Sequence, residues 1–180
     1  MIRTTRSTTR ALAFVATLGA LVLGVAAPAQ ARTGDIHCIV FADDGTVVCA
    51  ETLAAADEAF TAETGYTRDG DVGARGEAVT RGGIVPLAVY SLATFYQNTL
   101  YGGSSLTITR STPCNGSTQS GFSDLSAYGM NNSISSFITY GSCQARLYDG
   151  TGYTGGTFGY TTTQASLPLF NDLASSVRAR

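Results

Sequence analysis

The sequence contains no lysine, and its 11 basic residues are all arginine, against 13 acidic residues and one histidine. A glycine-rich phosphate loop depends on a lysine, so this type of nucleotide site is excluded. His37 stands alone and leaves no obvious base to activate a serine or cysteine nucleophile. The chain also lacks a Cys-x-x-Cys pair, which argues against a zinc site. We therefore expect a protein that is not an enzyme.

The one long apolar run lies at the N-terminus. The basic segment MIRTTRSTTR precedes ALAFVATLGALVLGVAA, and APAQA places Ala29 and Ala31 at the small-residue positions of a cleavage site. This pattern predicts a secretory signal peptide over residues 1–31, with a membrane anchor as the alternative. Cleavage removes 3 of the 11 arginines and leaves a charge of 8 − 13 = −5. We expect a secreted (extracellular) chain with no nucleic-acid partner and no membrane association after cleavage.

Four cysteines in an exported chain predict two disulfides, for which three connectivities exist. In CIVFADDGTVVC, a four-residue loop over 42–45 separates two apolar runs and places Cys38 opposite Cys49. The residues between them then pair in register: Ile39 with Val48, and Val40 with Val47. This local pairing leaves Cys114 with Cys143.

The amino-acid composition and the pattern of apolar residues change along the mature chain. Residues 32–65 hold the disulfide hairpin and a predicted short helix in ETLAAADEAFTAETG, which Thr52 caps and Gly65 ends. The expected buried face of this helix consists of Leu53, Ala56 and Phe60. Residues 66–87 are rich in glycine and poor in apolar residues, which predicts a linker. Residues 88–180 contain short alternating runs such as SLTITR and SSFITYG, which predict an all-β sandwich.

Two pairs of segments repeat within residues 88–180. YQNTLYGGSSL (96–106) and YDGTGYTGGTF (148–158) align without a gap, with tyrosines and a glycine at matching positions. The hexads NNSISS (131–136) and NDLASS (171–176) follow in the same order. The chain therefore holds two copies of one unit, about 89–141 and 144–180. Each glycine suits a turn with positive φ, and the last serine of each hexad can hydrogen-bond the folded hairpin.

The ordered pattern of aromatic-x4-aromatic-x-Gly followed by [Asn/Asp]-[Asn/Asp]-x-x-[Ser/Thr]-Ser, twice, resembles the βγ-crystallin family. The likeness covers about residues 88–180 and points to the microbial, secreted, calcium-binding type. It implies an all-β fold in which two Greek-key motifs form a β-sandwich, preceded by the small disulfide hairpin and short helix. This N-terminal part resembles small exported actinobacterial proteins that carry such a domain.

The resemblance implies up to two calcium ions, each bound by both hexads. It assigns the ligands to side-chain oxygens at the first, second and fifth positions and to a main-chain carbonyl at the third. Those residues are Asn131, Asn132, Ser133 and Ser135 in one hexad, and Asn171, Asp172, Leu173 and Ser175 in the other. Gln97 and Asp149 would add main-chain oxygens.

The hexad NNSISS has no carboxylate, and calcium affinity falls with ligand charge, so we expect one ordinary and one weaker site, or two sites of modest affinity. The alternative is that both hexads form only turn hydrogen bonds and bind no ion. In the family pattern the last serines, Ser136 and Ser176, are structural.

The same resemblance also allows a second function, inhibition of a protease. Streptomycete metalloprotease inhibitors are built on a related fold and also carry two disulfides. Inhibition needs a rigid exposed loop, and the best candidate is RSTPCNGSTQSGFSD, anchored at Cys114. The partner would then be an extracellular protease. The alternative for this loop is a tolerated surface insertion, since lengthening a loop costs little.

Overall fold

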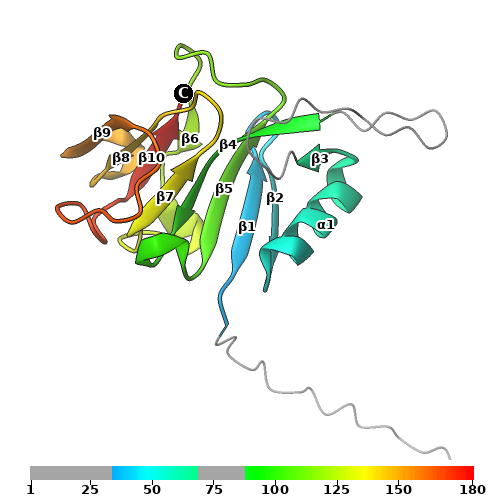
Figure 1. Cartoon of the computed structure of the whole chain (residues 1–180), viewed down its shortest axis with the longest axis horizontal. Helices are drawn as coiled ribbons and strands as arrows, with labels where there is room; N and C mark the ends of the chain where they lie inside the picture. Colours follow the sequence, from blue (N-terminus) through cyan, green and yellow to red (C-terminus); the bar gives the residue numbers. More distant parts are fainter. Residues whose placement is uncertain (1–33, 69–87) are drawn as a thin grey trace, which may run out of the picture. The chain divides into compact units, whose positions relative to one another are not determined.

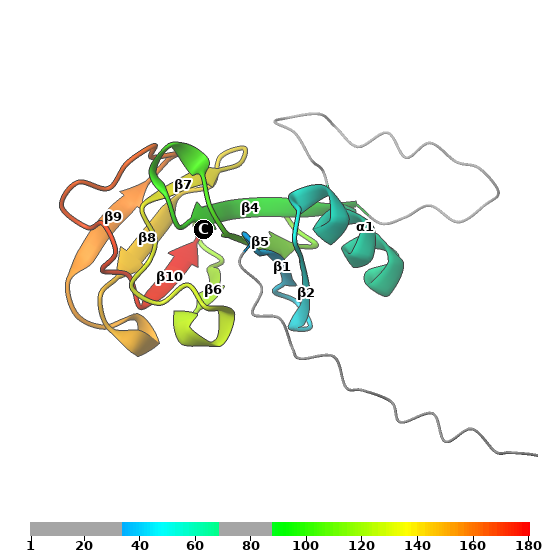
Figure 2. The ribbon, with the colours of Figure 1, turned by 90° about the horizontal axis from the view of Figure 1, so that it is seen from below.

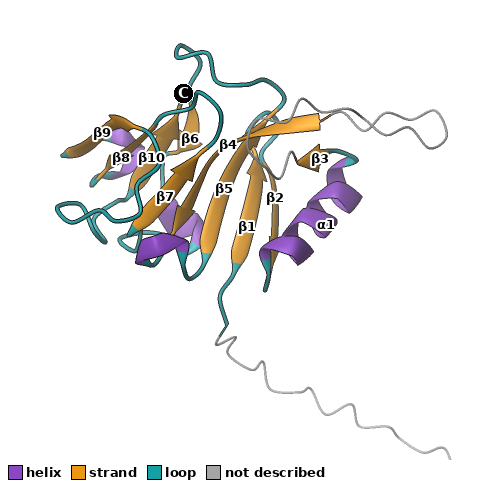
Figure 3. Cartoon of the chain, viewed as in Figure 1, coloured by secondary structure: helices purple, strands orange, loops and turns teal. Residues whose placement is uncertain are grey.

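The computed structural model of the chain describes residues 34–68 and 88–180. The predicted signal peptide, 1–31, and most of the predicted linker lie outside the described residues. Within them the chain forms two β-sheets and one α-helix (Figures 1 and 3). None of the helices in this part of the chain is long and apolar enough to cross a membrane.

The first sheet has the strand order β2-β1-β5-β4-β3, and β7 also pairs with β4. Its strands are β1 (His37–Phe41), β2 (Thr46–Ala50), β3 (Thr67–Arg68), β4 (Ala88–Tyr96), β5 (Ser105–Arg110) and β7 (Ser136–Thr139). The second sheet has the order β6-β10-β8-β9. Its strands are β6 (Ser120–Phe122), β8 (Ala145–Tyr148), β9 (Thr157–Thr161) and β10 (Ser176–Ala179). The helices are α1 (Leu53–Thr64) and three short 3-10 turns, η1 (Thr99–Tyr101), η2 (Leu125–Tyr128) and η3 (Thr151–Tyr153).

The N-terminal hairpin has the register that the sequence predicts. Cys38 lies opposite Cys49 and is bonded to it, and the pairs between them are Ile39–Val48 and Val40–Val47. The second disulfide joins Cys114 to Cys143. Helix α1 begins where Thr52 accepts a hydrogen bond from the N–H of Ala55 at 3.1 Å and ends at Gly65, whose φ is 72°. The predicted pairings and helix ends are confirmed.

The hairpin extends the first sheet, because β1 pairs in parallel with β5. Helix α1 covers the outer face of this sheet (Figure 2) and buries Ala56 and Phe60 against Ile39, Phe41 and Val89. Residues 34–68 therefore form a continuous structure with the β-sheets, a contact that the sequence did not predict. The described residues, 34–68 and 88–180, belong to one compact unit.

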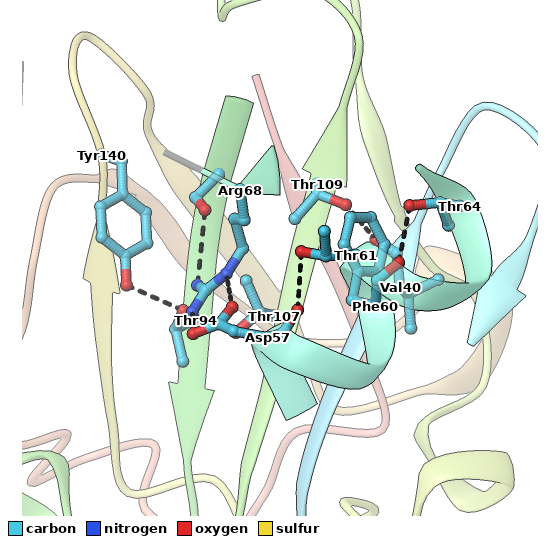
Figure 4. Close-up of polar contacts among 11 residues, drawn as sticks. Val40, Asp57, Phe60, Thr61, Thr64, Arg68, Thr94, Thr107, Thr109 and Tyr140 are labelled. Atoms are coloured by element: carbon cyan, nitrogen blue, oxygen red, sulfur yellow. Dashed lines mark hydrogen bonds and ion pairs between the residues drawn. The ribbon is translucent and has the colours of Figure 1, made fainter. Parts of the chain in front are cut away.

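The predicted linker is wrong for its first three residues, 66–68. The ring of Tyr66 lies 5.2 Å from that of Phe41, and β3 pairs in parallel with the start of β4. Arg68 then donates two hydrogen bonds to the carboxylate of Asp57, at 2.6 and 2.8 Å (Figure 4). Glycine-rich composition predicted a linker here, but an ion pair to α1 and a sheet edge order these residues.

The two C-terminal units exchange a strand. β6 belongs to the first unit by sequence but pairs with β10 of the second unit. In return, Gln164 of the second unit forms an isolated bridge to Phe137 in β7, with both backbone hydrogen bonds at 2.9 Å. The second unit contributes only this isolated bridge to the first sheet. The exchange joins the sheets around one core that includes Leu92, Phe95, Leu106, Ile134, Phe137, Leu147 and Val177.

Candidate metal centre

Each unit begins with a folded tyrosine corner, and the two corners have the same geometry. Tyr96 and Tyr101 have ring centroids 5.8 Å apart at 63°, and Tyr148 and Tyr153 have theirs 5.8 Å apart at 67°. In the first unit, Ser136 Oγ donates to the carbonyl of Asn98 at 2.6 Å and accepts from the N–H of Tyr101 at 3.1 Å.

In the second unit, Ser176 Oγ donates to the carbonyl of Gly150 at 2.6 Å and accepts from the N–H of Tyr153 at 3.0 Å. The prediction that the last serine of each hexad holds the folded hairpin is confirmed.

The second corner requires its glycine for a steric reason. Gly155 has a φ of 81°, and a Cβ there would lie 1.9 Å from Oδ1 of Asp149. That carboxylate oxygen is in place because it accepts a hydrogen bond from the N–H of Gly156 at 2.7 Å. The side chain of Asp149 therefore holds its own hairpin, and its main-chain oxygen is the part available to the predicted site.

The two hexads cross at their second and fifth positions. Ser135 Oγ donates to Asp172 Oδ1 at 3.1 Å, and Ser175 Oγ donates to Asn132 Oδ1 at 3.2 Å. Asn132 and Asp172 both have positive φ, at 52° and 55°. This conformation is uncommon in residues other than glycine, and asparagine and aspartate are among those that tolerate it best.

The backbones of the hexads repeat this crossed pattern. The N–H of Asn132 donates to the carbonyl of Ala174 at 2.8 Å, and the N–H of Asp172 donates to that of Ile134 at 3.1 Å. The residue at the second position of each hexad is thus hydrogen-bonded to the backbone of the fourth residue of the other hexad. The predicted ligands at these positions therefore come together in pairs that span both units.

Each hexad is also fixed to the corner of its own unit. The N–H of Ser135 donates to the carbonyl of Tyr96 at 3.0 Å, and the N–H of Ser175 donates to that of Tyr148 at 2.8 Å. Gln97 and Asp149 directly follow these tyrosines. Their main chains therefore run beside the fifth positions of the hexads, where the family pattern expects an oxygen ligand.

The remaining predicted ligands differ between the hexads. Asn131 Oδ1 and Ser133 Oγ are buried and have no hydrogen-bond partner among the described residues. Buried polar atoms of this kind normally have a partner, and oxygens are the atoms that a hard cation binds, so these two side chains fit a cation site. In the other hexad, Asn171 Nδ2 donates to Asp172 Oδ2 at 2.6 Å, and the side chain of Leu173 is 46% exposed. Leu173 can therefore contribute only its main chain.

The donor set is chemically suited to a hard cation. It consists of hydroxyl, amide and main-chain oxygens with one carboxylate, that of Asp172, whose two oxygens accept from Ser135 and Asn171. Calcium accepts six to eight oxygens of these kinds at about 2.3–2.6 Å. No group of three or more His, Cys, Asp or Glu side chains gathers within residues 34–68 and 88–180. An ion in the hexads would therefore depend mainly on neutral oxygens.

Neither a protein-family model nor a curated protein sequence matches this chain. Solved structures similar to it include a βγ-crystallin domain from Flavobacterium johnsoniae, with 26% identity over 49% of this chain and 93% of that one, and a TM-score of 0.39. A βγ-crystallin domain from Clostridium beijerinckii has 22% identity over 49% of this chain and 95% of that one, and a TM-score of 0.39. A βγ-crystallin from Ciona intestinalis has 20% identity over 47% of this chain and 94% of that one, and a TM-score of 0.37.

The contacts within residues 88–180 define the class of fold. Two Greek-key units exchange a strand, each has a tyrosine corner held by a serine, and their hexads cross. This is a βγ-crystallin-type fold, as the resemblance of the sequence implied.

Proposed function

We propose that residues 88–180 are a secreted calcium-binding module of the βγ-crystallin type, in which the ions stabilise the fold. The crossed contacts of the hexads support this proposal most strongly. Asn132 and Asp172 each reach a serine hydroxyl of the other unit at about hydrogen-bond distance, 3.2 and 3.1 Å. A purely structural corner needs only Ser136 and Ser176, which have other partners. The crossed oxygens hold neither corner, and they bring groups of both units together at two points.

The crossing groups the ligands into two sites. The Ser135 site would use the Ser135 hydroxyl, the Asp172 carboxylate and main-chain oxygens of Gln97 and Ser133. The Ser175 site would use the Ser175 hydroxyl, the Asn132 amide and main-chain oxygens of Asp149 and Leu173. Asn131 and Asn171, at the first positions, would supply further side-chain oxygens. Calcium supplies positive charge that holds these oxygens together.

The two proposed sites differ in charge. Only the Ser135 site would include a side-chain carboxylate, because Asp172, the second residue of NDLASS, crosses to the serine of NNSISS. The Ser175 site has the neutral Asn132 at the same position. Because affinity rises with ligand charge, we expect the Ser135 site to bind calcium more tightly. The hexad without a carboxylate thus contributes its serine to the stronger site.

Ion binding would stabilise the native chain because each site needs groups from both units, which separate on unfolding. A ligand at 100 times its dissociation constant adds about 2.7 kcal/mol to the free energy of unfolding. Extracellular modules bind calcium at about 10⁻⁴–10⁻³ M, so millimolar calcium is the appropriate range for a test.

The test is thermal unfolding of the oxidised chain in excess EGTA and in millimolar calcium, with magnesium as the ionic control. We expect calcium to raise the melting temperature and the double variant Ser135→Ala/Ser175→Ala to abolish the rise. The matched control is Ser111→Ala/Ser117→Ala, which removes two hydroxyls at exposed positions. The proposal fails if calcium has no specific effect on the unaltered chain.

One observation favours the second candidate function, inhibition of a secreted metalloprotease. The inserted loop is exposed over 111–113 and 115–119, yet its ends are fixed. Arg110, only 4% exposed, donates to the carbonyls of Thr112 and Pro113 at 3.1 and 2.9 Å. Asn115 Oδ1 accepts hydrogen bonds from the N–H groups of Ser117 and Thr118, and a disulfide joins Cys114 to Cys143. A preorganised exposed loop is what inhibition requires.

This second candidate is tested by titrating the chain into a secreted metalloprotease with a small peptide substrate. Inhibition that is lost when residues 115–118 are replaced by Gly-Ser-Gly-Ser would support it. An uninhibited protease would leave the loop as a surface insertion and would not affect the calcium proposal.

A further inference from the structure

Three arginines and three tyrosines gather on the outer face of the second sheet. Strand alternation explains the arrangement, because Leu147 and Val177 point into the core while their neighbours point outward. We call this surface the arginine–tyrosine face, and it consists of Arg146, Arg178, Arg180, Tyr148, Tyr153 and Tyr160. The corresponding outer face of the first sheet lies under helix α1.

The guanidinium groups of this face stack on the tyrosine rings. Arg178 lies 3.7 Å from the ring centroid of Tyr153, and Arg180 lies 3.7 Å from that of Tyr160. Arg146 lies between two rings, 5.3 Å from Tyr148 and 5.5 Å from Tyr160. Stacking fixes the planes of the guanidinium groups, which lowers the entropy that binding would cost them.

The positive charges on this face have no acidic partners in the described residues. The one ion pair in residues 34–68 and 88–180 is Arg68 with Asp57. Arg146 and Arg178 even lie directly opposite each other on β8 and β10, a placement that disfavours like charges. Their hydrogen bonds go to neutral groups, Thr157 at 3.1 Å and Gln119 at 2.8 Å.

Two donors of the face also lack hydrogen bonds. The Nε atoms of Arg146 and Arg180 are buried without a partner among the described residues. Arginine carries five N–H donors, and a charged donor left unpaired costs more than a neutral one. The buried Nε atoms are out of reach of a ligand, but the terminal nitrogens of Arg146 and Arg178 lie at exposed contacts with Thr157 and Gln119. The face thus presents uncompensated positive charge on guanidinium groups held in fixed planes, which suits anionic oxygens.

We propose that the arginine–tyrosine face binds an acidic polysaccharide through its carboxylate or sulfate groups. The backbones of neighbouring strands are about 4.8 Å apart, and alternate residues on one strand are about 6.6 Å apart. Arg146, Arg178 and Arg180 therefore present charges at regular short intervals, which suits a polymer with repeating anions. The neighbouring Gln119 and Thr157 side chains can hydrogen-bond sugar hydroxyls.

The stacking disfavours a nucleic acid as the ligand. Proteins bind single strands by stacking bases on aromatic rings. Here Arg178 stacks on Tyr153, and both Arg146 and Arg180 stack on Tyr160, so these rings are already occupied. The terminal nitrogens of Arg146 and Arg178 lie at the surface beside Thr157 and Gln119, where anionic oxygens can approach them, whereas few ring faces are left for bases.

The proposal does not rest on calcium binding, and the experiment is done in EGTA to separate the two. We would titrate the oxidised chain with heparin oligosaccharide, with oligogalacturonate, and with single-stranded DNA of equal charge. The variant Arg146→Gln/Arg178→Gln should weaken binding of the sulfated or carboxylated oligosaccharide at least about tenfold. Each substitution removes the charge-assisted hydrogen bonds of one guanidinium group. Melting curves establish that each variant is folded.

Two controls isolate the guanidinium groups. Ala54→Glu/Ala55→Glu changes the net charge by the same amount at exposed positions of α1 and should leave binding unchanged. Arg146→Lys/Arg178→Lys keeps the charge but loses the planar donors, so we expect intermediate binding. The proposal is overturned if the unaltered chain binds no oligosaccharide or binds the DNA more tightly. It is also overturned if the glutamate control loses as much affinity as the glutamine variant, or if the lysine variant keeps the full affinity.

Discussion

The two units have nearly identical corners but different surroundings. β5 of the first unit has β1 along its outer edge, and all six of its residues are buried. β9, its counterpart, ends the second sheet and contains no fully buried residue. The repeated residues therefore set the geometry of each corner, while the added hairpin, helix and insertion decide how the first unit is covered.

The largest effect should come from removing the packing that covers the first sheet. Phe60 is fully buried between α1 and the sheet, and Phe60→Ala should lower the free energy of unfolding by about 3–5 kcal/mol. Phe158→Ala, at a half-buried position of β9, should cost less. Urea unfolding of the two variants gives the comparison, and an unchanged free energy of unfolding in Phe60→Ala would contradict the view that α1 forms part of the same cooperative structure.

The two disulfides offer a second comparison. Cys114 and Cys143 are 29 residues apart, and Cys38 and Cys49 are 11 apart. A disulfide that closes a longer loop removes more freedom from the unfolded chain. Removing Cys114–Cys143 should therefore lower the free energy of unfolding by about 1 kcal/mol more than removing Cys38–Cys49, from losses of about 3–4 kcal/mol each. Double serine variants and chemical unfolding measure this. The reverse order would mean that the hairpin disulfide has a larger role in the native sheet than its loop length gives it.

The two corners should respond equally to loss of their serines. Ser136 and Ser176 each make two hydrogen bonds to a folded hairpin, and the distances agree closely. Ser136→Ala and Ser176→Ala should each lower the free energy of unfolding by about 1–3 kcal/mol, because buried backbone groups lose partners. Clearly unequal losses in EGTA would show that the surroundings, rather than the repeat, govern the corners.

The smallest effect concerns alkaline pH. Burial, followed by the influence of Tyr140, raises the pKa of Tyr96 from 10.0 to about 12. The folded chain therefore holds this proton more tightly, and the stability that it contributes is complete below pH 10 and is lost as the pH rises through about 12. Tyr96→Phe should flatten the fall in stability over this interval. An unchanged slope in urea unfolding at several pH values would contradict the assignment.

The sequence predicted the features that depend on local spacing. The hairpin register follows from the distance between Cys38 and Cys49, and the ends of α1 follow from Thr52 and Gly65. The folded corners follow from the repeated tyrosines, glycines and serines. These features need only short segments, so their residues carry the signal directly.

The features that the sequence did not predict depend on distant contacts. The parallel pairing of β1 with β5 has no turn to indicate it, because β2, α1, β3, β4 and η1 separate the two strands in the sequence. Tyr66 packs on Phe41, and Arg68 pairs with Asp57. The glycine-rich composition of the segment gives no sign of these distant partners. The crossed pairing of Asp172 with Ser135, rather than with the serine of its own hexad, likewise becomes visible only in the folded chain.

We propose that the crossed hexads form two calcium sites of unequal charge. The most direct measurement is a calorimetric calcium titration of the oxidised chain beside Asp172→Asn and Asn132→Asp. We expect two sites, a weakened tighter site in Asp172→Asn, and a strengthened weaker site in Asn132→Asp, because each change alters one carboxylate at matching positions. Absence of calcium binding in the unaltered chain, or identical titrations for all three proteins, would contradict the account.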